Sequence, residues 1–570
     1  MTINQKYLVL IVALGVLFFF PFLGNVHLFD WDEINFAESA REMLVTQDFF
    51  RVQINYEPFW EKPPLFFWLQ ALSMEIFGIN EFAARFPNAL AGVITLWLLY
   101  TLGKKLYSPK FGLIWSLLYF GSFLPHLYFK SGIIDPIFNL FIFIAVYFLA
   151  KNVQVKQIKW SFWGGFFAGL AIITKGPVAV LLIILSYIVY LIYTRFKDKL
   201  RIKDIIVFAL TAFLVTSLWF GYEVINNGPW FIIEFIKYQI ELFTQPVAGH
   251  EQPFYYHFLV VLLGCFPMSV LALKAFQKNS ISDQNQSYFT LWMKILFWVV
   301  MILFTIVKTK IVHYSSMAYL PLSYLAALYV YHLIKEKQDL PKFIKIFFVI
   351  IGSVFSLLLI ATPILFYQKK WLEQLLVKDP FAVACLNYDL NFTGFEFLIG
   401  IFYPLGILMA LYFIKQKDYQ KMVFSLALAA GITLMGYAIF VVPKIERFSQ
   451  GPAILFLKSI QNKEAYVTTV GHKSYAHYYY GQVKPPKSTD KISDIRKNYV
   501  STLADKNDFN VITLNALVDN WLMTEAIDKP AYFITKINQR ENIKANFPQL
   551  NFIKNEGGFD FYSKEKTIIP

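Results

Sequence analysis

Apolar residues form long runs along most of this chain, and short polar segments separate the runs. Because crossing the hydrocarbon core of a bilayer takes about 20 predominantly apolar residues, a window of that length locates the candidate spans. By this length rule the pattern predicts about thirteen transmembrane helices. They lie near residues 6–25, 86–103, 111–128, 133–150, 160–174, 177–194, 204–224, 256–274, 289–307, 313–333, 343–366, 396–414 and 422–442.

The first apolar run, residues 7–23, lacks the small-residue cleavage site of a signal peptide and leads into a polytopic chain. It is therefore predicted to be the first span. The segment that follows, residues 26–85, is too long for a plain connector, because helix connections usually take about 2–8 residues. Within it, a helical spacing of apolar and small residues runs from Glu33 to Leu44 and again over residues 65–77. We expect two amphipathic helices that lie along the membrane interface in this first outer loop.

The texture of the sequence changes near residue 445, where β-prone runs begin to alternate with polar stretches of helical pattern. The β-prone runs are residues 464–482, 509–515, 530–536 and 551–563. Such alternation is typical of a small α/β domain. The sequence therefore predicts a transmembrane domain over residues 1–444 and a soluble α/β domain over residues 445–570.

The composition supports a membrane protein, since 57% of the residues are hydrophobic and only 16% are charged. These values lie outside the range of soluble domains. The formal charge of +14 does not indicate a nucleic-acid partner, because the Lys and Arg residues sit in short clusters between apolar runs. By the positive-inside rule the clusters mark cytoplasmic loops, which places the acidic first loop and the C-terminal domain on the other side. The two cysteines match no metal-ligand spacing.

The candidate chemistry begins with five carboxylates within residues 28–43, directly after the first span. Asp32 and Glu33 stand at the predicted N-terminus of a helix, whose dipole favours ionised carboxylates. The simpler alternative is a solvated acidic face with Asp32 as a helix N-cap. Further along the loop, Glu61 and Lys62 precede two prolines between aromatic clusters. A charged pair at the membrane surface is costly unless it has a partner, so this second half of the loop favours a functional site.

Several motifs resemble those of the GT-C superfamily of integral-membrane glycosyltransferases, in the branch that joins protein O-mannosyltransferases and lipid A aminoarabinose transferases. The motifs are DEINFAESAREM (32–43), WEKPPLFFW (60–68), ITKGPVAVLL (173–182), GHEQPFYYHFLVVLLGCFP (249–267) and KTKIVHYSSMAYLPL (308–322). The resemblance covers about residues 5–445. It implies an α-helical polytopic fold with interfacial helices in the first outer loop and, as in bacterial members, a soluble C-terminal domain.

The resemblance also implies a reaction. The family takes a sugar from a polyprenyl-phosphate donor and transfers it, with inversion, to a hydroxyl or phosphate of a lipid, protein or glycan acceptor. The expected partners are therefore this donor, such an acceptor and membrane lipids, with no nucleic acid. The expected location is the bacterial inner membrane, with the site and the C-terminal domain on the periplasmic side.

The same motifs imply roles for single residues. Asp32, the first of the Asp-Glu pair with Glu33, matches the catalytic carboxylate that orients or deprotonates the attacking group. Lys62 matches the lysine that holds the donor phosphate. Further donor-phosphate contacts are implied for Lys175 and Tyr314, and substrate contacts for Arg41, Asp135, Lys310 and His313. The alternatives are snorkelling for the lysine at a helix end, an N-cap for the aspartate before Pro136, and interfacial placement of the Tyr and His.

A divalent metal is the one cofactor that the sequence raises. Glu61 lies where some relatives hold a metal, and His250 could join it, since imidazole plus carboxylate suits Zn²⁺ or Mn²⁺. The segment FIKYQIELF (235–243) departs from the aminoarabinose branch, because it lacks the His and Arg expected there. That departure leaves both the metal and the identity of the sugar open.

Two other classes of protein stand as alternatives. A transporter or lipid flippase predicts inverted repeats and ionisable residues within the spans, whereas the span interiors here are nearly free of them. A binding or assembly protein predicts that removing residues 445–570 abolishes activity while Asp32→Asn is harmless. The sequence has no Walker or Rossmann glycine pattern, which argues against a nucleotide-sugar enzyme or an ATP-driven pump.

Overall fold

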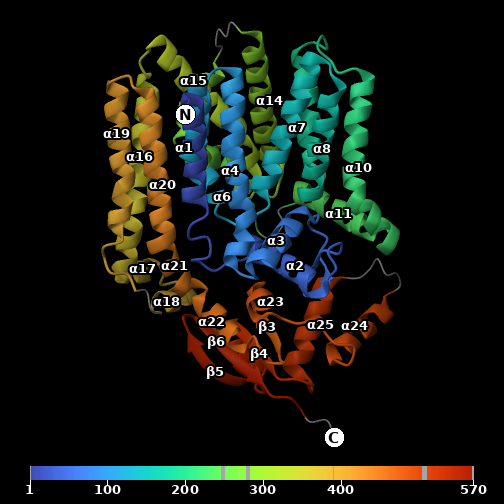
Figure 1. Ribbon diagram of the computed structural model, residues 1–570. Helices are drawn as coiled ribbons and strands as arrows, with labels where there is room; N and C mark the ends of the chain where they lie inside the picture. Colours follow the sequence, from blue (N-terminus) through green and yellow to red (C-terminus); the bar gives the residue numbers. More distant parts are fainter. Residues whose placement is uncertain are drawn as a thin grey trace.

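The structure, a computed structural model, describes residues 2–245, 249, 251–277, 283–388, 391–503 and 510–567. It consists of a bundle of apolar helices and, at one end of the bundle, an α/β unit with a four-stranded sheet (Figure 1). The first loop, with α2 (Asp32–Thr46) and α3 (Leu65–Phe77), lies between these two parts. The predicted α-helical fold class is confirmed.

Eight helical segments of the described chain are long and apolar enough to cross a membrane. They are α4 (Glu81–Leu106), α7 (Asp135–Val155), α10 (Ile202–Asn227), α14 (Gln284–Ile306), η3 (Val312–Ala318) with α15 (Tyr319–Glu336), α16 (Lys342–Tyr367), α19 (Phe397–Lys415), and α20 (Tyr419–Phe440) with α21 (Val442–Ser449). Helices of this length and apolarity match the thickness of a bilayer core. The chain is a multi-pass membrane protein.

The remaining predicted spans correspond to shorter or broken helices, so the length rule does not establish the count of thirteen. The shorter helices are α1 (Ile3–Phe19), α8 (Ile158–Lys175) and α9 (Val178–Tyr193); the broken ones are α5 (Pro109–Phe120) with α6 (Phe123–Tyr128), and α12 (Tyr256–Gly264) with α13 (Met268–Ala272) and η2 (Leu273–Phe276). The last pair is bent by 109°, so the prediction of one continuous span over residues 256–274 is wrong. Pro267 cannot donate a helical hydrogen bond and restricts the residue before it, and the helix ends there.

Both helices predicted for the first loop exist, but α2 does not lie on the surface. Eleven of its fifteen residues are buried, including six polar or charged ones, because it packs against α3 on one side and against α23 (Ala476–Gly481) of the α/β unit on the other. The short strands β1 (Gln53–Ile54) and β2 (Glu57–Pro58) pair between the two helices. α3 fits the prediction of an interfacial helix better, because its apolar residues Leu72 and Ile76 are exposed.

The α/β unit contains the sheet β3-β4-β6-β5, in which β3 and β4 are parallel and the other neighbours antiparallel. The strands are β3 (Tyr466–Val470), β4 (Ala531–Lys536), β5 (Asn551–Glu556) and β6 (Phe559–Lys564). The accompanying helices are α22 (Gly451–Ile460), α23, α24 (Lys491–Thr502), α25 (Val511–Thr524), η5 (Ile537–Gln539) and α26 (Arg540–Asn546). Three of the predicted β-prone runs contain these strands.

The fourth predicted β-prone run, residues 509–515, is wrong as a strand, because its described part opens α25. The side chain of Asn510 accepts hydrogen bonds from the backbone N–H groups of Ile512 and Thr513. This N-cap satisfies two donors that a helix otherwise leaves free. The cap outweighs the β propensity of the residues that follow it.

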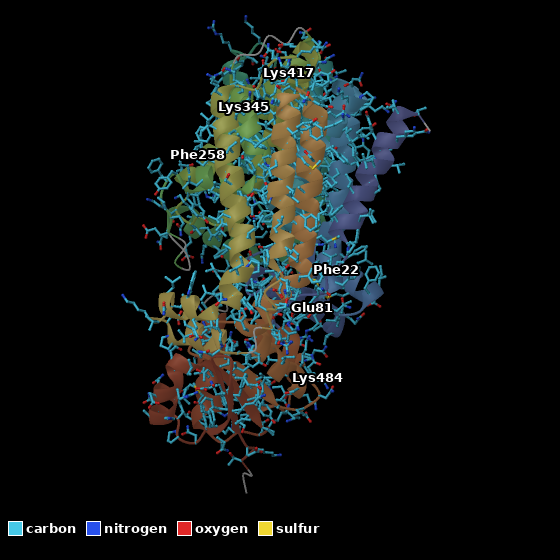
Figure 2. All side chains as sticks on the ribbon, turned by 90° about the vertical axis from the view of Figure 1, so that its left-hand side faces the viewer. Phe22, Glu81, Phe258, Lys345, Lys417 and Lys484 are labelled. Carbon is cyan, nitrogen blue, oxygen red and sulfur yellow. The ribbon has the colours of Figure 1, made fainter. Side chains whose placement is uncertain are left out.

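The two ends of the bundle carry different connections. The lysine-rich connections between α15 and α16 and between α19 and α20 lie at the end away from the sheet, where Figure 2 shows Lys345 and Lys417. Glu81 and Lys484 lie toward the other end, beside the first loop and the α/β unit. The described residues contain three further short helices: α11 (Trp230–Thr244), α17 (Lys369–Leu375) and α18 (Pro380–Leu386).

One buried ion pair attaches the first loop to the bundle. Arg85 of α4 donates to both carboxylate oxygens of Glu33, at 2.9 and 2.7 Å, and both side chains are buried. The same guanidinium donates to the carbonyl groups of Leu23, Val26 and His27. The Arg85 side chain therefore holds the end of the first segment and the start of α2 against α4.

We expect Arg85→Ala to lower the stability of the protein by about 3–5 kcal/mol, because it leaves the Glu33 carboxylate buried and unpaired. The melting temperature of the purified protein in detergent measures this effect. The matched control is Lys417→Ala, which removes an exposed pair with Asp339 and should change stability by less than about 1 kcal/mol. Equal melting temperatures for the two variants would contradict the anchoring role.

Candidate active site

Charged and aromatic side chains from five separate elements meet where the first loop contacts the bundle. Asp32 begins α2, Asp135 begins α7, Lys175 ends α8, and His313 lies in η3. Lys62 precedes α3. Asp32, Lys62, Asp135 and Lys175 all act electrostatically on the His313 imidazole, so the structure brings these five predicted residues into one cluster.

The His313 imidazole lies between two carboxylates. Its Nε2 is 3.8 Å from an oxygen of Asp32 and 4.0 Å from an oxygen of Asp135. Asp135 is buried, and its other oxygen is 2.6 Å from the Lys175 ammonium. Asp32 is different, because 42% of its side chain is exposed and no hydrogen bond within the described residues engages its carboxylate. Asp32 is thus the carboxylate of the cluster that remains accessible to a substrate.

Helix ends position these charges. Gly176 is the C-cap of α8. Its φ of 99° favours glycine, and a Cβ there would lie 2.2 Å from the ring of Phe235. The chain therefore stops the helix directly after Lys175, a cation at a helix C-terminus, while Asp32 and Asp135 stand at N-termini. The helix dipoles favour each of these charges. Neither aspartate caps its helix through its side chain, so the N-cap alternative does not apply to them.

Lys62 supplies a positive charge with little internal compensation. Within the described chain its ammonium has one carboxylate in ion-pair range, that of Glu61 at 4.0 Å. It also lies 5.5 Å from the centre of the Tyr238 ring, and the Tyr238 hydroxyl donates to Glu61 at 3.3 Å. Burial and the charge of Glu61 raise the pKa of Tyr238, so it stays a hydrogen-bond donor at neutral pH. Lys62 can therefore attract an anion from outside the protein.

Tyr314 also belongs to the cluster. The Lys175 ammonium lies 5.4 Å from the centre of its ring, and Asp32, Glu61 and Asp135 act electrostatically on its hydroxyl. No hydrogen bond within the described residues engages that hydroxyl. It can thus donate to a ligand that reaches Lys62 and Lys175.

Three of the predicted site residues make their contacts outside this cluster. Both oxygens of Glu33 are engaged by Arg85. The Lys310 ammonium donates to the carbonyl of Val307 at 2.8 Å. Arg41 lies nine residues beyond Asp32 on α2, which at about 100° per residue is the opposite face of the helix. For these three residues the substrate or catalytic role remains a prediction that their contacts do not support.

Arg41 belongs to a buried network that joins α2 to the α/β unit. It donates to both oxygens of Glu38 at 2.7 Å and to the carbonyl of Val483 at 2.9 Å. One oxygen of Glu42 accepts from the backbone N–H of Tyr56, and the other has no partner within the described residues. Burial and the neighbouring Glu38 raise the pKa of Glu42 well above its usual value. The surroundings of Glu42 therefore favour its neutral form.

The described residues supply no set of ligands for the predicted metal. His250 lies outside the described residues, and within them no group of three or more His, Cys, Asp and Glu side chains converges. The nearest described neighbours of Glu61 are the Lys62 ammonium and the Tyr238 phenol, which suit an anion better than a cation. A role for Zn²⁺ or Mn²⁺ at Glu61 stays a prediction, and no step below depends on it.

Sequence reasoning missed the contributions of the α/β unit to this region. The backbone N–H of Tyr475 donates to the Asp30 carboxylate at 3.2 Å, and the Tyr480 hydroxyl accepts from the backbone N–H of Leu28 at 2.6 Å. Asp32 and Glu61 act electrostatically on the Tyr475 hydroxyl, and burial together with these charges raises its pKa. The run SYAHYYY (474–480) was the available signal, as a concentration of aromatic residues in the predicted soluble domain.

Comparisons with known proteins agree with this geometry. A sequence profile of dolichyl-phosphate-mannose-protein mannosyltransferases matches residues 61–220. An uncharacterized protein of Aquifex aeolicus (strain VF5) is 30% identical over 373 residues, which are 64% of this chain and 81% of that protein. An undecaprenyl phosphate-alpha-4-amino-4-deoxy-L-arabinose arabinosyl transferase of Proteus mirabilis (strain HI4320) is 28% identical over 360 residues, which are 60% of this chain and 61% of that protein.

The fold comparison covers nearly the whole chain. The crystal structure of ArnT from Cupriavidus metallidurans bound to undecaprenyl phosphate superposes with a TM-score of 0.73. It is 17% identical to this chain, and the match covers 98% of each protein. The architecture, including the α/β unit, is thus shared with that structure.

The raised pKa of Glu42 predicts a pH dependence of stability. Because its pKa in the folded protein lies above the unfolded value of 4.5, the contribution of Glu42 to folding is complete below about pH 4.5 and is lost as the pH rises through the folded pKa. Glu42→Gln cannot ionise and should flatten the fall in melting temperature as the pH rises above about 4.5. Glu38→Gln should instead lower the melting temperature throughout, since it leaves Arg41 unpaired. Parallel pH profiles for wild type and Glu42→Gln would reject this assignment.

Proposed function

This chain belongs to the GT-C superfamily of integral-membrane glycosyltransferases, and we propose that it transfers a sugar from a polyprenyl-phosphate donor to a lipid acceptor at the extracytoplasmic face of the membrane. The proposal rests on two side chains of the same cluster at the membrane boundary. The Asp32 carboxylate is accessible, and the charge of the Lys62 ammonium is only weakly compensated by neighbouring carboxylates. One group can accept a proton and the other can hold a phosphate.

The proposed reaction is a single displacement at the anomeric carbon of the sugar. Asp32 accepts the proton of the attacking acceptor oxygen, or orients that oxygen if it belongs to a phosphate. The oxygen forms a bond to the anomeric carbon while the bond to the donor phosphate breaks, and the phosphate leaves with the electron pair. One displacement inverts the configuration at that carbon. The charge that develops on the leaving phosphate is stabilised by Lys62, with Lys175 and the Tyr314 hydroxyl beside it.

Asp135 and His313 position the reacting groups in this scheme. Asp135 fixes the Lys175 ammonium at 2.6 Å, so this cation stays at the end of α8 when the donor is absent. His313 lies 3.8 Å from Asp32, beyond hydrogen-bond distance, so it flanks the proposed base without engaging its carboxylate oxygens. A carboxylate whose oxygens are not engaged can act as a general base.

The two ends of the bundle support the proposed side of the membrane. The lysine-rich connections lie at the end away from the sheet (Figure 2), and positive loops tend to remain cytoplasmic. In the proposal, Asp32, Lys62 and the α/β unit therefore lie outside the cytoplasm. In a bacterium the corresponding membrane is the inner membrane. There the lipid-linked donor supplies the sugar, and no nucleotide sugar is needed.

The names of the relatives support a polyprenyl-phosphate donor. One is an arabinosyl transferase that uses undecaprenyl phosphate-alpha-4-amino-4-deoxy-L-arabinose, and the matching structure contains undecaprenyl phosphate. The aminoarabinose donor and lipid A are therefore the first pair of substrates to test. Mannosyl-phosphoryl polyprenol is the second donor, because the family profile is that of mannosyltransferases and Tyr238 occupies a segment that departs from the aminoarabinose branch.

Asp32→Asn should reduce sugar transfer by at least about a hundredfold, since it removes the general base. The assay incubates the full-length protein with each synthetic donor and lipid A and measures the glycosylated lipid by mass spectrometry. Asp48→Asn is the matched control: it makes the same change in the same loop, just beyond the other end of α2, and should leave transfer within about twofold. Full activity of Asp32→Asn would exclude the proposed base.

Lys62→Ala should raise the KM for the donor and lower kcat, with a combined loss of about a hundredfold or more in kcat/KM, because the ammonium contacts the phosphate before and after the bond breaks. Steady-state rates at varied donor concentration measure both constants. Lys484→Ala, at an exposed lysine of the α/β unit, is the control and should match wild type. A Lys62→Ala protein with an unchanged kcat/KM for the donor would refute the phosphate contact.

A further inference from the structure

We propose that Lys473, Trp31 and Tyr475 bind the phosphate-bearing headgroup of the lipid acceptor. This inference rests on the proposed transfer reaction, because it assigns the acceptor side of the same site. The three residues come from two distant parts of the chain: Trp31 directly precedes Asp32, and the other two follow β3 in the α/β unit. We call them the headgroup cluster.

The contacts within the headgroup cluster fix the position of its cation. The Lys473 ammonium lies 4.6 Å from the centre of the Trp31 ring and 5.4 Å from that of Tyr475. The two rings meet edge to face, with centroids 6.0 Å apart and planes at 82°. An ammonium over an aromatic face is attracted by the ring quadrupole, so Lys473 is held beside the residue that precedes the proposed base.

The first loop holds this segment of the α/β unit in place. Both oxygens of Asp30 accept from the backbone N–H of Tyr475, at 3.2 and 3.3 Å. Asp30 also hydrogen-bonds the side chain of Ser474. Hydrogen bonds from a backbone N–H to a carboxylate are charge-assisted. The segment that carries Lys473 is thus attached to the loop that carries Asp32.

The direction of attack places the acceptor on this side of Asp32. In an inverting displacement the nucleophile approaches the anomeric carbon opposite the leaving phosphate. The groups proposed to hold that phosphate come from the bundle and from the segment before α3: Lys62, Lys175 and Tyr314. We therefore assign the acceptor to the side of the α/β unit, where the Tyr475 hydroxyl lies within electrostatic range of Glu61, Asp30 and Asp32.

The charge of Lys473 favours an anionic headgroup over a neutral one. Lys473 is exposed; it acts electrostatically on the Asp30 carboxylate, but it forms no ion pair or hydrogen bond within the described residues. Three other lysines of the α/β unit are paired with carboxylates: Lys487 with Glu464, Lys529 with Asp490, and Lys554 with Glu556. A cation that remains unpaired at the mouth of the site suits a phosphate, which accepts charge-assisted hydrogen bonds.

The test is the acceptor dependence of transfer by full-length Lys473→Glu, with diphosphoryl lipid A as the acceptor. We expect the KM for lipid A to rise at least about tenfold, which is what the loss of a hydrogen bond to a charged group is worth. The KM for the donor should stay within about twofold, and Lys473→Arg should restore the KM for lipid A. The control is Lys463→Glu, because Lys463 also lies over an aromatic ring, that of Tyr532, at 5.0 Å, and its ammonium donates to the Tyr532 hydroxyl within the α/β unit.

Binding measurements separate this inference from the proposed reaction. On an Asp32→Asn background, which cannot turn over, Lys473→Glu should weaken binding of diphosphoryl lipid A and leave binding of its dephosphorylated form unchanged. If wild type binds lipid A through Lys473 but transfers no sugar, the proposed reaction fails and the headgroup cluster stands.

The opposite outcomes overturn the inference. Asp32-dependent transfer with the same KM for lipid A in Lys473→Glu and Lys463→Glu removes the headgroup cluster and keeps the reaction. An equal rise in the KM for the donor assigns Lys473 to the donor side instead. An equal effect of Lys473→Glu on binding to phosphatidylglycerol vesicles shows a site for bulk anionic lipid rather than for the acceptor.

Discussion

The buried pair between Arg85 and Glu33 is the interaction on which the site depends. Arg85 belongs to a membrane helix, and Glu33 directly follows the accessible carboxylate Asp32. A buried ion pair is not in itself a source of stability. It does fix the relative position of its two side chains, because burying either charge without the other would be costly. The carbonyl groups of residues 23–27 complete the coordination of the guanidinium. Arg85, which is not among the proposed substrate-binding residues, therefore fixes the position of the proposed base, Asp32.

The ends of helices provide the rest of the charge arrangement. Asp32 and Asp135 stand at helix N-termini and Lys175 at a helix C-terminus. The partial charge of the helix dipole at each of these ends is opposite to the charge of the side chain, which is therefore favoured there. Such placement matters at a membrane boundary, where a charge without a partner is expensive. The chain thus keeps ionised groups at the edge of the bilayer without placing them inside the spans.

Local pattern predicted most of the fold, and long-range contacts account for what it missed. Apolar runs and the β-prone run at residues 551–563 were readable because one segment carries the whole signal. The burial of α2 was not, because its polar face is covered by α23, and the contact between Asp30 and Tyr475 joins residues 445 positions apart. The motifs of the resemblance contain Asp32, Lys62, Lys175 and His313, which the structure brings into one cluster with Asp135. The same resemblance did not separate Glu33 and Arg41, whose contacts lie in the interior.

The two sides of the site are therefore built by different means. The proposed donor side consists of Lys62, Lys175 and Tyr314, which belong to the recognisable motifs, and the bundle fixes Lys175 at the end of α8. The side toward the α/β unit is formed by a segment attached through backbone N–H groups to Asp30 and through the Val483 carbonyl to Arg41. Backbone contacts constrain the path of that segment but leave its side chains free to change. A chain of this family can accordingly keep one chemistry for the lipid-linked donor while residues such as Lys473 and Tyr475 adapt the same site to another acceptor.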